Sequence, residues 1–177
     1  PKQTPTKGTF ERHIREVEKD FWDRRFRVYR DWKESWFANY RKAGSFRMLT
    51  GFTVGGLHGK NDVVNYPVQG AAFHCLLWSL IRLQKWISRN RMGAKIIGQI
   101  HDSILADVPI EGVQDYLTVA RRIMTEDLPK AWDWIIVPLD VEAEVSPESG
   151  SWHGKEKWEE RDGEWSPKGS LRLARAN

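Results

Sequence analysis

The segment at residues 69–87 constrains the fold of this chain more than any other, because it is apolar on most of its faces. It reads QGAAFHCLLWSLIRLQKWI and follows Pro67. A helix that is apolar nearly all round has to be buried inside a domain. The chain has 177 residues, which is enough for one domain with a core but short for two. The sequence therefore predicts one domain built around this helix.

Residues 95–108, KIIGQIHDSILADV, predict a β-hairpin, because two apolar runs flank the polar triplet His101, Asp102 and Ser103. A carboxylate held at such a turn has little freedom, as the binding of a hard divalent cation demands. This makes Asp102 the strongest candidate for a site. The alternative is that Asp102 only caps its own turn.

The other elements are predicted from apolar periodicity and from glycine and proline breaks. They are one long amphipathic helix or two shorter ones over 10–41 with Thr9 as cap, a short strand at 46–53, a helix over 113–128 stopped by Pro129, and an edge strand over 135–145. The order predicts an α+β fold, with a small antiparallel sheet backed by helices. Residues 1–9 are expected to be an irregular lead-in, 10–154 the domain, and 155–177 a polar, partly disordered tail.

Two amide side chains, Asn65 and Gln69, stand four residues apart just before the apolar helix. Amides suit the minor groove of a duplex, where every base pair offers acceptors. The alternative is that Asn65 and Pro67 simply start the helix. In residues 10–41, basic side chains alternate with aromatic ones, which would line a DNA backbone or form a solvated face.

The composition of the chain favours a protein of a reducing compartment. Cys75 is the single cysteine, and no apolar run approaches the roughly 20 residues of a membrane helix. We expect a cytoplasmic protein that has no membrane partner. The formal net charge of +4 is compatible with a polyanionic partner. The sequence starts at Pro1 rather than Met, which suggests a processed or fragment boundary.

Three segments in order resemble the C-terminal palm portion of family A DNA polymerases, the bacterial polymerase I and bacteriophage replicative type. FRMLTGF at 46–52 resembles the family's T-x-x-G-R strand and turn, and NYPVQGAAFHCLLWSLIRL at 65–83 its N-x-P-x-Q-G helix. GQIHDSILADVP at 98–109 resembles motif C, Q-V-H-D-E. The resemblance covers about residues 10–155 and implies a DNA-directed DNA polymerase of DNA replication.

By this resemblance Asp102 is a ligand of the catalytic Mg²⁺ ions, and His101 lies near the primer terminus. Gln99, Asn65 and Gln69 would approach primer-template DNA in the minor groove. The reaction implied is nucleotidyl transfer from a dNTP by two Mg²⁺ ions roughly 3.5–4 Å apart. Ser103 departs from the family, which often has Glu there, and His74 stands in place of its usual Asp.

The family's second metal-binding aspartate, in a D-Y-S-x-I-E-x-R-like segment, does not occur in this sequence, and neither does its nucleotide-gripping fingers helix. We therefore expect a C-terminal fragment or subunit that shares its Mg²⁺ ions with an aspartate of an upstream polymerase fragment. It would act in the cytoplasm of a bacterium or a phage-infected host. The rivals are an inactive DNA-binding or assembly remnant of the palm, and an unrelated α+β protein.

Overall fold

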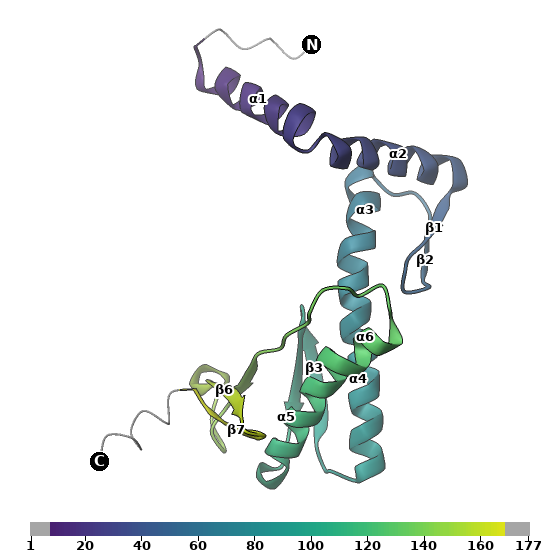
Figure 1. The fold of residues 1–177 in the computed structure, drawn as a ribbon. Helices are drawn as coiled ribbons and strands as arrows, with labels where there is room; N and C mark the ends of the chain where they lie inside the picture. Colours follow the sequence, from purple (N-terminus) through teal and green to yellow (C-terminus); the bar gives the residue numbers. More distant parts are fainter. Residues whose placement is uncertain (1–7, 169–177) are drawn as a thin grey trace. The chain divides into compact units, whose positions relative to one another are not determined.

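The computed structural model describes residues 8–168, which form two compact units (Figure 1). The first unit extends to Gln69 and the second begins at Gly70. Each unit buries apolar side chains of its own, such as Tyr40 and Val63 in the first and Leu83 and Ile87 in the second. The expectations for residues 1–7 and 169–177 lie outside the described residues. No helix in the described part of the chain is long and apolar enough to cross a membrane.

The first unit consists of helices and one short hairpin. Its elements are α1 (Phe10–Asp20), the π-helical turn η1 (Phe21–Arg25), α2 (Arg27–Ala43), β1 (Ser45–Arg47), β2 (Thr53–Gly55) and α3 (Lys60–Asn65). The predicted helical region over 10–41 is thus two helices separated by η1. Thr9 caps the first, since its hydroxyl accepts from the N–H of Arg12 at 3.4 Å. The strand predicted at 46–53 is instead the hairpin β1–β2.

Helix α2 holds α3 and the β1–β2 hairpin through its aromatic side chains. The indole of Trp36 donates to the carbonyl of Val63 in α3 at 3.0 Å, and the hydroxyl of Tyr40 donates to the carbonyl of Gly56 at 2.6 Å. Both rings meet the edge of Phe46 from β1. Gly44 ends α2 at φ 73°, a left-handed conformation in which glycine carries no steric penalty.

The chain then passes through the π-helical turn η2 (Tyr66–Gly70), which contains Pro67. A proline inside a helix removes a backbone donor, and a π-helical turn is one way to accommodate that break. The alternative that Asn65 and Pro67 start a helix is wrong, because α3 begins at Lys60. At the N-terminus of α3, the N–H of Gly59 donates to the carboxylate of Asp62 at 3.2 Å.

The second unit carries the predicted hairpin and the remaining sheets. Its elements are α4 (Ala71–Asn90), β3 (Lys95–Ile100), β4 (Ser103–Asp107), the 3₁₀ turn η3 (Ile110–Gly112), α5 (Val113–Arg122), the π-helical turn η4 (Ile123–Asp127), α6 (Leu128–Ala131), β5 (Ala143–Val145), the 3₁₀ turn η5 (Trp152–Gly154), β6 (Glu156–Arg161) and β7 (Glu164–Pro167). The α+β class is confirmed. The described strands form three small antiparallel sheets, β1–β2, β3–β4 and β5–β6–β7, rather than one.

The core of the second unit lies between α4, α5 and the β3–β4 hairpin (Figure 1). Leu83 and Ile87 of α4 pack with Tyr116 of α5, and half-buried Ile96 and Ile104 of the hairpin pack against them. Burying side chains of this size contributes about 1.5–3 kcal/mol each. The hairpin is therefore anchored by its strands, and its turn is left to project from the core.

The apolar segment 69–87 forms a helix as predicted, but it is not buried on most faces. The buried side chains of α4, which are Leu76, Ser79, Leu83 and Ile87, recur every three to four residues on a single face. Phe73 and Ile81 are 46% and 45% exposed.

The helical region over 113–128 contains a π-helical turn that the sequence did not predict. Ile123 at its start and Leu128 just after it are 4% and 2% exposed. Because a π-helical turn bonds residue i to i+5, it brings this pair to the same side. Pro129 does not stop the helix and instead lies in the first turn of α6, where its missing N–H has no helical partner to lose.

The structure corrects the prediction of a loosely held tail from residue 155. β6 and β7 pair there, and the Asp162–Gly163 turn between them has φ 52° and 84°, as the tightest hairpin loops require. Trp165 is only 5% exposed. The side chain of Gln114 in α5 accepts a hydrogen bond from the backbone N–H of Trp165 at 2.8 Å and donates one to the carbonyl of Trp165 at 2.7 Å. The strand predicted over 135–145 is restricted to Ala143–Val145.

The turn of the β3–β4 hairpin consists of two residues, His101 and Asp102, between the paired Ile100 and Ser103. His101 adopts φ 51°. A positive φ at a turn residue suits the twist of a two-residue hairpin, and His is among the side chains that tolerate it best.

We expect Gln114→Ala to lower the free energy of unfolding by about 1–3 kcal/mol, because it leaves two backbone groups of a buried residue without a partner. Urea unfolding followed by tryptophan fluorescence measures this. Gln84→Ala is the control, since Gln84 is exposed and its side chain bonds to the exposed Ser88. Equal effects of the two changes would contradict the role of Gln114.

We expect His101→Val to destabilise the chain by about 1–2 kcal/mol, because a β-branched residue is strained at positive φ. His101→Gly should change the free energy of unfolding little, since glycine adopts this conformation freely. The same urea titration compares them. A valine variant as stable as the glycine variant would show that the turn makes no such demand.

Candidate functional site

The candidate site is the turn of the β3–β4 hairpin. Its strands are anchored in the core, while Gln99, His101, Asp102 and Ser103 are all exposed. Three of the predicted site residues, Gln99, His101 and Asp102, are therefore brought together on one short and well-supported element. Their side chains are accessible to a ligand.

Hydrogen bonds to the backbone close this turn. The amide of Gln99 donates to the carbonyl of His101, and the hydroxyl of Ser103 donates to the carbonyl of Ile100 at 2.8 Å. The role of Ser103 was missed from the sequence, where it counted only as a departure from Glu. The sequence offered one signal for this role, because serine hydroxyls often form hydrogen bonds to nearby backbone groups in turns.

The carboxylate of Asp102 makes no hydrogen bond or ion pair with any described residue. The alternative that Asp102 caps its own turn is therefore wrong in this structure, since Ser103 and Gln99 supply the side-chain bonds of the turn. An exposed carboxylate without a protein partner keeps its oxygens available to a cation.

The donor set fits a Mg²⁺ ion only in part. Carboxylate oxygen is a ligand that Mg²⁺ prefers. Within residues 8–168, however, no three His, Cys, Asp or Glu side chains gather where they could hold a metal. Asp102 can thus supply one ligand of a metal site, and the remaining carboxylates have to come from elsewhere.

Two other predicted site residues belong to the first unit. Asn65 is the last residue of α3 and Gln69 lies in η2, and both are exposed. Residues four apart on a helix lie on neighbouring positions of one face. The two amides therefore form a pair on one face of this helical segment.

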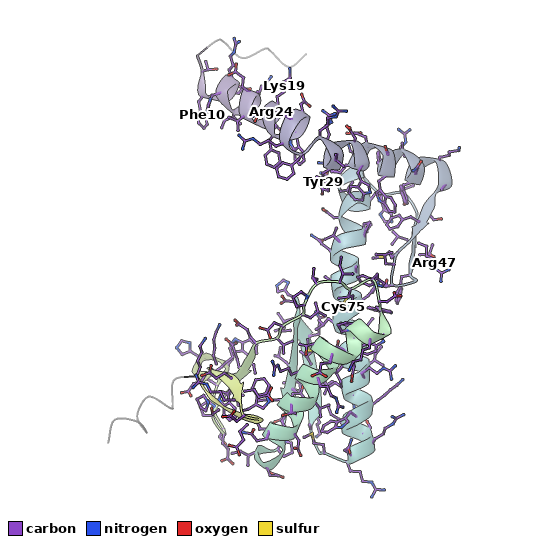
Figure 2. All side chains as sticks on the ribbon, viewed as in Figure 1. Phe10, Lys19, Arg24, Tyr29, Arg47 and Cys75 are labelled. Carbon is purple, nitrogen blue, oxygen red and sulfur yellow. The ribbon has the colours of Figure 1, made fainter. Side chains whose placement is uncertain are left out.

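His74 occupies the position where the resemblance led us to expect an aspartate. It is half-buried next to the half-buried Cys75, which Figure 2 labels on α4. Burial lowers the pKa of His74 and raises that of Cys75, so each favours its neutral form. A neutral imidazole supplies no negative charge to a cation site at this position.

Comparison with known proteins gives the same family for these elements. The sequence model described as DNA polymerase family A matches residues 56–153, which include α3, η2, α4 and the β3–β4 hairpin. DNA polymerase I of Lactococcus lactis subsp. cremoris is 32% identical over 83 residues, covering 47% of this chain and 9% of the relative. DNA polymerase I of Aquifex aeolicus is 22% identical over 127 residues, covering 68% of this chain and 21% of the relative.

A solved structure supports the fold. The POL domain of Pol1 from M. smegmatis, in complex with DNA primer-template and dNTP, superimposes with a TM-score of 0.54 and 19% identity. The match covers 64% of this chain and 22% of that one. The chain thus spans a small part of the length of its relatives. Since the family model matches more than half of the sequence, including the hairpin and the amide pair, the chain belongs to DNA polymerase family A.

Proposed function

We propose that this chain is the part of a DNA-directed DNA polymerase that supplies one metal-binding carboxylate and the duplex-contacting amides. The observation that carries the proposal is the exposed carboxylate of Asp102 on a core-anchored turn, which has no partner among the described residues. It lies inside the region that matches DNA polymerase family A.

In this proposal Asp102 holds Mg²⁺ jointly with an aspartate from a polymerase segment that this sequence does not contain. Mg²⁺ so bound would polarise the reacting oxygens and neutralise charge on the leaving pyrophosphate. The role of this chain is to hold the carboxylate of Asp102 in a fixed position. The bond from Gln99 to the carbonyl of His101 and the positive φ of His101 restrict the turn that carries Asp102.

The exposed imidazole of His101 is proposed to contact the primer terminus, next to Asp102 in the turn. Asn65 and Gln69 are proposed to donate to acceptors in the minor groove of primer-template DNA. The M. smegmatis domain, which was solved with primer-template and dNTP, supports these partners for the fold. The bacterial relatives support a cytoplasmic place of action.

The segment that completes the site is proposed to carry the second aspartate and the helix that grips the incoming nucleotide. It would belong to the same polymerase, either on the same polypeptide or on another. A two-metal site needs carboxylates from more than one segment, and within residues 8–168 no three His, Cys, Asp or Glu side chains gather where they could hold a metal.

We expect primer extension when the chain is combined with such a segment, and we expect Asp102→Asn to lower its rate by at least about two orders of magnitude, since loss of one charged ligand removes metal-dependent stabilisation of the transition state. Duplex affinity should hardly change. Asp107→Asn is the control, because Asp107 is also exposed but lies at the far end of β4.

Full activity of the Asp102→Asn variant would refute the assignment of the metal ligand. Robust synthesis by the chain alone, with Mg²⁺ or Mn²⁺, would refute the need for a completing segment. Duplex binding without synthesis under any combination would instead support an inactive DNA-binding remnant.

We expect Gln69→Ala to weaken primer-template binding about fivefold, because one hydrogen bond is worth about 1 kcal/mol. The loss should be similar for all base pairs at the terminus, since minor-groove acceptors are common to them. Fluorescence anisotropy on duplexes that differ in the terminal pair measures this, with Gln84→Ala as the control. A loss confined to one base pair would count against groove contacts.

A further inference from the structure

The turn η1 and helix α2 carry a series of neighbouring aromatic rings. Trp22, Tyr29, Trp32 and Trp36 follow one another with ring centroids 6.1, 5.6 and 5.9 Å apart and interplanar angles of 28°, 16° and 20°. The ammonium of Lys33 lies 3.6 Å from the ring centroid of Trp22 and 4.9 Å from that of Tyr29. Lys33 thus holds the first two rings of the series together and adds positive charge beside them.

A groove of about 480 Å³ opens beside this series. Its lining combines cationic and apolar side chains, and consists of Arg24, Arg25, Phe26, Arg27, Val28, Tyr29 and Trp32. Phe26, Tyr29 and Trp32 remain 47%, 44% and 37% exposed. These are large solvent-facing aromatic surfaces next to three guanidinium groups; Figure 2 labels Arg24 and Tyr29 among them.

The arginines keep donors that their acidic neighbours do not use. Asp20 accepts from Arg24 at 2.5 Å and from Arg25 at 2.9 Å, which lowers the pKa of its carboxyl and holds both guanidinium groups beside the groove. A guanidinium has five N–H donors, so both retain several. Arg27 comes no closer than 3.7 Å to Asp31 and makes no hydrogen bond with a described residue.

Positive charge therefore exceeds negative charge around the groove. The cations are Arg24, Arg25, Arg27, Arg30 and Lys33, and the acids paired with them are Asp20, Asp23 and Asp31. Exposed rings beside spare guanidinium donors match the chemistry of a strand that alternates phosphates with unstacked bases. Bases inside a duplex are already stacked on one another and cannot offer their faces.

We propose that the groove of η1 and α2 binds single-stranded nucleic acid, with phosphates on Arg25 and Arg27 and bases on Tyr29 and Trp32. This surface is distinct from the hairpin turn and from the amide pair. It needs neither a metal nor the segment that completes the polymerase site.

Anisotropy of a fluorescein-labelled oligo(dT) of about 15 nucleotides, titrated with the full chain, tests the proposal. We expect Trp32→Ala to weaken binding about tenfold, as loss of one stacking partner does. Phe10→Ala is the control, because Phe10 is an exposed aromatic residue outside the groove (Figure 2). Helix content by circular dichroism shows whether each variant is folded.

A second variant tests charge without removing a ring. Arg27→Gln should lower the slope of log affinity against log salt by about 0.7, the share of one phosphate contact on a single strand. Lys19→Gln, also exposed and outside the groove, should leave the slope unchanged. Oligo(rU) and a blunt duplex of equal length serve as the other ligands, and affinity within about threefold for oligo(rU) would extend the site to RNA.

The proposal is overturned if the duplex binds as tightly as the single strand, or if Trp32→Ala and Arg27→Gln both match their controls. It is also overturned if sedimentation shows that the chain self-associates through these residues and binds no oligonucleotide, which would make a second copy the occupant. Asp102→Asn should leave oligo(dT) affinity unchanged, so failure here is distinguishable from failure of the proposed polymerase role.

Discussion

The packing of the β3–β4 hairpin against α4 and α5 is the interaction on which the candidate site depends. Ile96 and Ile104 hold the two strands on a core formed by Leu83, Ile87 and Tyr116. A turn of only two residues then has almost no freedom of its own. The precision with which Asp102 is placed thus originates in apolar contacts several residues away, and the polar bonds of Gln99 and Ser103 complete it.

The two units differ in how they use their apolar residues. The second unit buries a cluster of large side chains between its helices and the hairpin, whereas α1 buries none and carries Phe10 at 79% exposure. In η1 and α2 the exposed rings lie among paired charges, so this surface is held in place by ion pairs and ring contacts as well as by burial. Such ion pairs contribute little stability individually, and their effect here is to restrict side-chain positions.

Much of the fold could be predicted from sequence where one local signal decided it. The hairpin followed from two apolar runs around His101 and Asp102, and the helical region predicted over 10–41 corresponds to α1 and α2. The dipeptide Asp162–Gly163 is an equally clear sequence signal for a hairpin turn. The strands β6 and β7 on either side of it are rich in charged residues, so their sequence did not predict a strand, although β7 contains the buried Trp165. The candidate site was harder to predict: residue types made Asp102 a candidate, whereas the bond from Ser103 to Ile100 depends on the geometry of the turn. The division into two units could not be predicted, since it depends on which faces pack.

The π-helical turn between α5 and α6 affects how this helical region responds to the deletion of a residue. Ile123 and Leu128 are both buried although five residues separate them, a spacing that an ordinary α-helix would place on different sides. A π-helical turn is equivalent to an α-helix that has accepted one extra residue without losing its packing on either side. Deleting one residue within 124–127 would return the backbone to α-helical bonding and leave Ile123 and Leu128 four positions apart, about 40° around the helix axis and therefore still on one side. This part of the helix therefore tolerates the loss of one residue better than an uninterrupted α-helix, in which the same deletion would rotate every later side chain by about 100°.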